Sequence, residues 1–257
     1  MKTRISFEHQ KHCLLGIGSA VLFASLLLST PAAAAADNTI LKEVDRRLQH
    51  PSYEAYRKLV NIEPSGARKE FVLYTVKQGR DKVLALFLSP ASEKGRSTLR
   101  LGENMWLYIP NVGKPLRITS LQSVTGGVFN NSDILRVDYT SEYDTKAIKT
   151  STDTHLLTLK AKNSSVAYDK LEMTVDRKTL APRVIKCFAA SGMLIKTLKF
   201  KQIKDFGSGL KRPAVIETTS PLQKGYRSVM IFAKIKPKKL RKEYFSLSYM
   251  PRAGELR

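Results

Sequence analysis

The spacing of apolar residues changes along the chain and divides it into two kinds of region. From Asp37 to Pro51 apolar residues recur every three or four positions, which predicts an amphipathic helix. A similar spacing from Ser52 to Ile62 predicts a second helix. From Glu70 onward apolar and polar residues alternate, which is typical of strands that bury one face.

The alternating region predicts a long antiparallel meander. Its first hairpin joins Phe71–Lys77 to Lys82–Ser89, and readable turns separate the strands that follow. We expect one basic helical turn over Pro237–Lys242 and a last strand over Tyr244–Met250. A sheet of this kind has one apolar face, so it must curl or be covered to hide that face from water.

The stretch Asn104–Pro110 is almost wholly apolar or aromatic and is too short for a buried helix, so it predicts a strand covered on both faces. The cover is either a packed core or a bound ligand. The Gly- and Asn-rich stretch Ser123–Asp133 predicts an excursion over the sheet, followed by a short turn or helix over Ile134–Thr140.

The N-terminus predicts export. A basic start, an uncharged run over residues 14–28 and a small-residue region ending at Ala36 together indicate a secretory signal peptide over residues 1–36. A membrane anchor is the alternative, but the run is shorter than the roughly 20 residues that span a bilayer. We therefore expect a periplasmic protein cleaved near Ala36, with residues 37–257 forming a single domain.

The formal net charge is +22, and the basic residues are spread along the whole chain. Most lysines alternate with apolar residues on strands, which is typical of a solvated sheet face. An exported protein seldom meets nucleic acid, so we expect no nucleic-acid partner. Anionic lipid headgroups at a membrane surface are a better match for this charge.

The sequence holds few residues for catalysis or metal binding after the leader. His50 and His155 lie in different regions, and Cys187 is the one cysteine, so no metal-ligand spacing and no disulfide is expected. Asp133 and Asp138 could serve as an acid–base pair, but a capping role for Asp133 is the favoured interpretation. We expect no enzyme and no cofactor; a hydrolase that uses His155 and Asp133 remains the weakest alternative.

Several segments, in this order and spacing, resemble one known family. They are Phe87–Pro90, Met105–Pro110, Arg117–Ile118, Ser132–Asp133, Val175–Pro182, Leu194–Leu198, Ile203–Asp205 and Phe245–Met250. Together with the Ala-rich leader, they resemble the outer membrane lipoprotein-sorting (LolA-like) proteins of Gram-negative bacteria. The resemblance covers nearly all of residues 37–257.

The resemblance implies a fold that is mainly β with short α elements: a curved antiparallel sheet forming an incomplete β-barrel, with helices plugging its concave side. It implies a periplasmic carrier that binds acyl chains of lipoproteins or phospholipids in a hydrophobic cavity and moves them toward the outer membrane. Its partners would be an inner-membrane transporter and an outer-membrane acceptor, and we expect a monomer. The alternative is a lipid-sensing or protein-interaction module of the same fold in envelope regulation.

The cavity prediction rests on the apolar phase of each strand and on the covering loop. The predicted lining residues are Met105, Leu107, Ile109, Leu116, Ile118, Phe129, Leu157, Leu159, Met173, Val175 and Ile231. Lys114 and Arg117 are predicted at the rim, where they would meet headgroup phosphates. A slip of one residue in any strand would turn its side chains to the other face.

Overall fold

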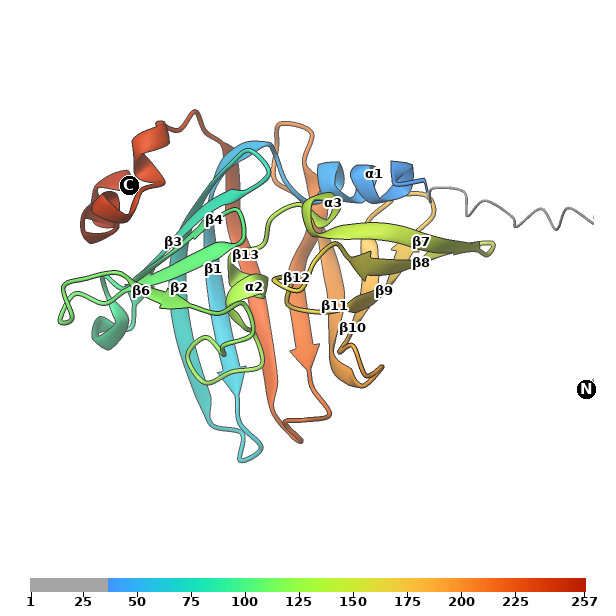
Figure 1. Cartoon of the computed structure of the whole chain (residues 1–257), viewed down its shortest axis with the longest axis horizontal. Helices are drawn as coiled ribbons and strands as arrows, with labels where there is room; N and C mark the ends of the chain where they lie inside the picture. The colour runs from blue at the N-terminus through green and yellow to red at the C-terminus, as the bar shows by residue number, and fades with distance from the viewer. Residues whose placement is uncertain (1–36) are drawn as a thin grey trace, which may run out of the picture. The chain divides into compact units, whose positions relative to one another are not determined.

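The structure, a computed structural model, describes residues 37–257, and its main feature is one antiparallel sheet of 13 strands (Figure 1). The strands are β1 (Ser52–Ile62), β2 (Arg68–Gln78), β3 (Lys82–Ser89), β4 (Ser97–Leu101), β5 (Asn104–Tyr108), β6 (Leu116–Ile118), β7 (Tyr143–Thr150), β8 (Thr154–Ala161), β9 (Lys170–Asp176), β10 (Pro182–Phe188), β11 (Leu194–Asp205), β12 (Lys211–Thr219) and β13 (Arg227–Pro237). Their order is β6-β5-β4-β3-β2-β1-β13-β12-β11-β10-β9-β8-β7.

This sheet is strongly curved and does not close into a barrel, because its edge strands β6 and β7 are not paired with each other. Three helices lie on its concave side: α1 (Thr39–Leu48), α2 (Asn131–Ile134) and α3 (Tyr139–Glu142) (Figure 1). The predicted fold class, an incomplete curved barrel with helices in its mouth, is confirmed.

The concave side holds a large apolar core, and α1 contributes one stripe of it. Leu41, Val44 and Leu48 recur at three and four residues and are buried against the sheet, as the sequence pattern predicts. The predicted hairpin is also confirmed as β2 and β3. The predicted helix over Ser52–Ile62 is wrong, because that segment is β1, the central strand between β2 and β13.

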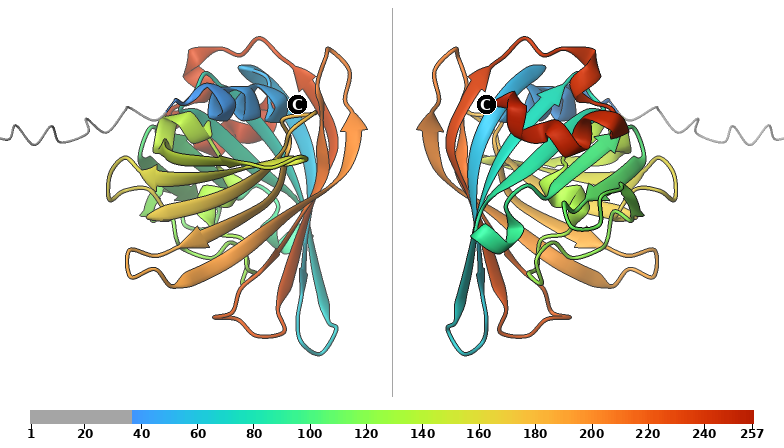
Figure 2. Two further views of the ribbon diagram at one scale, coloured as in Figure 1. Left: turned by 90° about the vertical axis from the view of Figure 1, so that its right-hand side faces the viewer. Right: turned by 90° about the vertical axis from the view of Figure 1, so that its left-hand side faces the viewer.

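A second, smaller core lies on the convex side of β2 to β5. The C-terminal 3-10 segment η3 (Leu247–Leu256) packs there against Tyr74, Leu86 and Leu99 (Figure 2, right). This cover explains why Asn104–Pro110 is apolar on both faces: Met105 belongs to the concave core, whereas Trp106 packs in the convex cluster. The predicted last strand is therefore wrong, since its residues form η2 (Lys242–Tyr244) and η3.

The predicted signal peptide lies outside the described residues. Among residues 37–257, no helix is both long and apolar enough to cross a bilayer.

Candidate functional site

The candidate site is the interior between the concave face of the sheet and the elements that cover it. The cover consists of α1 and of residues 119–142, here called the covering segment, which includes α2 and α3. The covering segment buries Val124, Phe129, Ile134, Leu135 and Val137 in the same core as the strands. The interior is thus bounded by two parts that are far apart in sequence.

Seven of the predicted cavity residues lie together in this interior. Met105, Phe129, Leu157, Leu159, Met173 and Val175 belong to the concave core, and Ile118 packs against it. Alternation on β8 and β9 explains why these residues lie together, because every second residue of a strand faces the same side of the sheet.

The other predicted residues lie elsewhere. Leu107 and Ile109 are only half-buried, and Leu116 is exposed on the short edge strand β6. Lys114 and Arg117 are also exposed, and Arg117 donates to the side chain of Asn104.

Ile231 was predicted to face the interior, but a β-bulge turns its side chain to the other face of the sheet. Tyr56 pairs with Lys234 and the next residue, Arg57, pairs with Phe232, so Ala233 is an extra residue on β13. Counting back from the buried Ile235 in steps of two would put Ile231 on the concave face. The extra residue shifts the alternation by one, so Phe232 faces the concave core and Ile231 does not. A bulge of this kind carries no clear sequence signal.

Protein side chains fill the apolar part of the interior. Leu157, Leu159, Met173 and Val175 are completely shielded from solvent. A hollow of about 350 Å³ does lie beside α1, but most of the residues that line it are polar or charged, and none of the predicted cavity residues is among them. Its lining residues are Lys42, Asp45, Arg46, Gln49, His50, Pro51, Lys77, Gly79, Arg80, Asp138 and Thr140.

Ion pairs that are buried or largely buried join the covering segment to the sheet at three places, and sequence reasoning missed them. Lys196 Nζ of β11 lies 2.8 Å from Asp133, Lys77 Nζ of β2 lies 2.8 Å from Asp138, and Arg100 Nη2 of β4 lies 2.6 Å from Glu142. In each pair the cation comes from the sheet and the carboxylate from the cover. The one feature of the sequence that could have indicated them is that these basic residues alternate in step with the residues that face the core.

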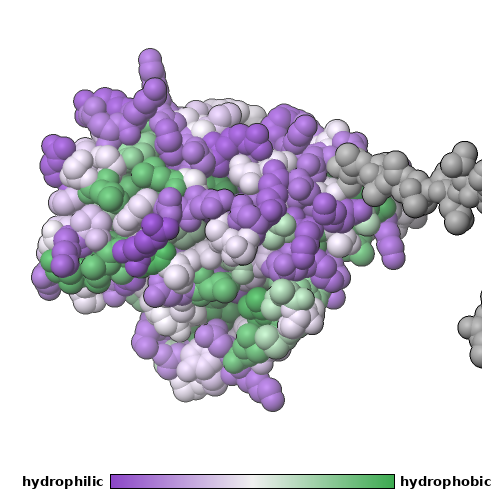
Figure 3. All heavy atoms as spheres, viewed as in Figure 1, coloured by the Kyte–Doolittle hydropathy of each residue, from purple (hydrophilic) through white to green (hydrophobic). Residues whose placement is uncertain are grey.

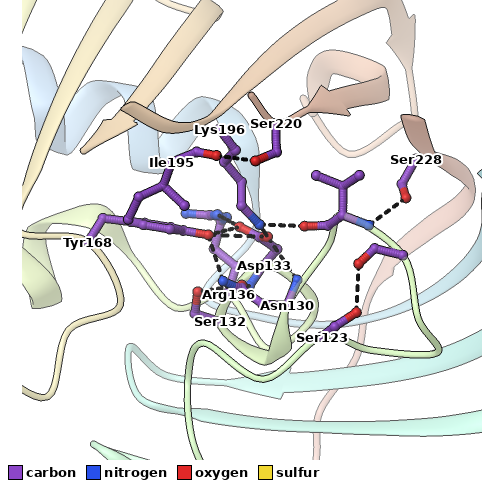
Figure 4. Close-up of polar contacts among 12 residues, drawn as sticks. Ser123, Asn130, Ser132, Asp133, Arg136, Tyr168, Ile195, Lys196, Ser220 and Ser228 are labelled. Carbon is purple, nitrogen blue, oxygen red and sulfur yellow. Dashed lines mark hydrogen bonds and ion pairs between the residues drawn. The ribbon is translucent and has the colours of Figure 1, made fainter. Parts of the chain in front are cut away.

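Asp133 is the centre of the most deeply buried of these ion pairs (Figure 4). Its carboxylate accepts from the backbone N–H of Asn130, completing a capping box at the start of α2, and also pairs with Arg136. Lys196 Nζ donates in addition to the carbonyl of Val128 at 2.6 Å. Asp133 therefore takes part in capping α2, but as the third residue of that helix and not, as predicted, as the cap of the turn that follows it. The ion pair adds to this role.

Asp45 ties α1 to α3. Its carboxylate accepts from the backbone N–H groups of Tyr139 and Thr140 at 2.7 and 2.9 Å and from the Thr140 hydroxyl. Burial, helped by the nearby charge of Asp138, nevertheless raises the pKa of Asp45 from 3.8 to about 6. Burial thus outweighs the hydrogen bonds, which favour the ionised form.

Stability should depend on pH through Asp45. Because its folded-state pKa lies above the unfolded value, its contribution is present in full below about pH 4 and is lost as the pH rises through 6. The difference in unfolding free energy between the natural protein and Asp45→Asn should fall by about 2–3 kcal/mol from pH 4 to pH 7. Denaturant unfolding at a series of pH values measures it, and a constant difference would contradict the assignment.

A second hollow, of about 180 Å³, lies between the covering segment and the ends of β11 and β12. Leu121 and Leu222 line it, and both are exposed. Lys196 and Asn130 also line it, so it lies next to the buried Asp133 pair. On the face of the molecule that Figure 3 draws, polar residues cover most of the surface and apolar patches interrupt them.

The described residues offer little support for a metal site or a reactive cysteine. Within residues 37–257, no group of three or more His, Cys, Asp or Glu side chains is placed to hold a metal ion. Cys187 is a buried free cysteine, as expected for a small core residue, and burial raises the pKa of its thiol.

Three solved structures share this architecture. A LolA superfamily protein of Nitrosomonas europaea is 25% identical, with a TM-score of 0.75 over 82% of this chain and 98% of that one. An outer membrane lipoprotein-sorting protein domain of Vibrio parahaemolyticus is 17% identical, with a TM-score of 0.70 over 83% and 97%. A DUF1329 family protein of Desulfovibrio piger is 18% identical, with a TM-score of 0.70 over 82% and 96%.

Comparisons of sequence add one family. No curated protein matches the chain. A family model with the description "Uncharacterized protein" matches residues 79–252, which is more than half of the chain. The chain therefore belongs to that family, and its fold is similar to that of LolA superfamily and outer membrane lipoprotein-sorting domain proteins.

Proposed function

We propose that this protein is a periplasmic carrier that binds the acyl chains of a lipid or lipoprotein between the curved sheet and its cover. The observation that carries the proposal is the apolar concave face, which is covered by separate segments and not by a second sheet. The LolA-like fold supports a carrier-type domain, and the predicted leader supports export.

Binding requires the cover to move, because protein side chains occupy the apolar interior. An acyl chain would take the place of cover residues such as Phe129, Ile134 and Leu135. Burial of the chain stabilises the complex by about 0.8 kcal/mol for each CH₂, which offsets the apolar contacts that the cover gives up. The exchange is therefore feasible for a chain of ordinary length.

The manner in which the cover is held suits such a movement. Its ion pairs to Lys77, Arg100 and Lys196 join two separable parts, and charged groups regain hydration when they part. An inner-membrane transporter that supplies the lipid and an outer-membrane acceptor that receives it complete the proposal. The protein itself performs no chemical reaction in this proposal.

Lipid binding tests the proposal directly. The protein purified from the periplasm should carry lipid that mass spectrometry identifies, and the delipidated protein should bind a fluorescent acyl probe. The same fluorophore without its chain is the control. Absence of both bound lipid and probe binding would contradict the carrier function and favour the lipid-independent interaction module.

The predicted compartment has its own test. The mass of the purified protein should correspond to a chain that begins near Asp37. A protein that keeps residues 1–36 would instead support the membrane-anchor alternative.

A further inference from the structure

Two arginines in the interior have no carboxylate partner. Arg57 of β1 and Arg212 of β12 are buried to 6% and 4% exposure, and among residues 37–257 neither forms an ion pair. Both lie near the ring of Phe232 on β13, with the guanidinium carbons 5.9 and 4.1 Å from the ring centre. Arg57 and Arg212 are here called the arginine pair.

The N–H groups of the arginine pair donate to uncharged oxygen atoms. Arg57 donates to the hydroxyl of Thr75 at 2.5 Å and to the carbonyl of Ile134, the last residue of α2, at 3.0 Å. Arg212 donates to its neighbour's carbonyl at 3.1 Å and to the carbonyl of Leu48, the last residue of α1. Arg57 Nε has no partner in the described region.

The contrast with the other interior bases is sharp. Lys77, Arg100 and Lys196 each face a carboxylate of the covering segment, so their charge is compensated. The two positive charges of the arginine pair have no counter-charge, and burial of an uncompensated charge lowers the stability of the fold. Burial lowers the pKa of both guanidinium groups to about 10, and both stay protonated at neutral pH.

We propose that Arg57 and Arg212 bind the phosphate group of an anionic lipid whose acyl chains lie in the interior. This inference rests on the proposed carrier function and narrows its substrate class. A guanidinium presents donors in a planar fork that matches two phosphate oxygens. Charge-assisted bonds are stronger than bonds to neutral carbonyls, so a phosphate can replace Leu48 and Ile134 as acceptor.

The space beside the arginine pair sets one condition. A void of about 20 Å³ lies next to Arg212 and is lined in part by Asp45, Leu48 and Tyr139. This volume is too small for a phosphate group, so α1 must shift before the group reaches the arginine pair. That condition agrees with the displacement of the cover that acyl-chain binding already requires.

The experiment compares two short-chain lipids that differ in the headgroup: dioctanoyl phosphatidylglycerol and dioctanoylglycerol. The natural protein should bind the phosphate-bearing lipid at least about tenfold more tightly. Arg212→Gln and Arg57→Gln should each remove most of this preference, measured as the ratio of the two affinities within each variant. Inorganic phosphate forms a separate arm: binding that depends on Arg212 without any lipid preference would identify a soluble phosphate as the ligand of the same site.

Lys211→Gln is the matched control. Lys211 is the neighbour of Arg212 on β12, carries the same charge and is exposed, so its substitution should leave the lipid preference intact. Thermal unfolding identifies any variant that fails to fold. Arg212→Lys provides a second variant that keeps the charge, and it should retain only part of the preference because it loses the planar fork.

Failure of this inference is distinct from failure of the carrier function. Equal binding of both lipids, unchanged in Arg57→Gln and Arg212→Gln, would overturn the phosphate site and leave the carrier function standing. Absence of binding by either lipid would instead overturn the carrier function.

Discussion

Asp133→Asn is expected to lower the free energy of unfolding by about 3–5 kcal/mol. The Asp133 and Lys196 side chains are only 2% and 4% exposed, and their atoms are 2.8 Å apart. Substitution of the carboxylate leaves the ammonium group of Lys196 buried without its counter-charge. It also removes the partner of Arg136 and one half of the capping box at α2.

Denaturant unfolding at neutral pH measures this effect, and Asp169→Asn is the matched control. Asp169 pairs with Lys160 at 2.6 Å, but these side chains are 31% and 50% exposed, so the control should cost less than about 1 kcal/mol. If both variants lose the same stability, the buried pair has no special role.

The double variant Asp133→Asn/Lys196→Met isolates the buried charge. It should recover part of the loss, because no cation remains without a partner and Met fits the apolar surroundings. A double variant that is less stable than the sum of the two single effects would contradict this account.

Leu157→Ala is expected to cost about 2–5 kcal/mol and to make the protein respond more strongly to an acyl ligand. Leu157 has no exposed surface and lies opposite Met173 between β8 and β9. Its truncation leaves an apolar space in the interior where the carrier proposal places acyl chains. Dry apolar cavities of this kind bind apolar molecules.

The measurement is the shift of the unfolding temperature on addition of a fatty-acyl probe. A ligand that binds only the folded state stabilises it by an amount that increases with its affinity, so the shift should be larger for Leu157→Ala than for the natural protein. Leu222→Ala, at an exposed position, is the control and should change stability by no more than about 0.5 kcal/mol. An equal shift in all three proteins would mean that the interior does not take up the chain.

Prediction from sequence was most successful where the pattern was local. The alternation over β8 and β9 correctly placed Leu157, Leu159, Met173 and Val175 in one core. The hairpin of β2 and β3 followed from its turn and its flanking alternation. These features depend on neighbours in the chain, so no knowledge of the tertiary structure was needed.

The errors arose where distant segments decide the structure. In Ser52–Ile62 the residues Tyr53, Tyr56 and Leu59 fit a helical spacing, but pairing with β2 and β13 makes the segment a strand. The C-terminal residues alternate like a strand, yet β13, the strand before them, already pairs with β1 and β12, and they pack as η3 on the convex side instead. Intrinsic preference is weak compared with such tertiary contacts.

The sequence alone determined the β character, the amphipathic first helix and the positive charge, because each is a property of composition or of local spacing. Only the tertiary structure decided which charges are compensated. Lys196 meets Asp133 and Lys77 meets Asp138 across long stretches of chain, whereas Arg57 and Arg212 meet neutral carbonyls. Which charges pair depends on how the covering segment lies on the curved sheet. The order of basic residues along the chain does not show which carboxylate each of them will contact.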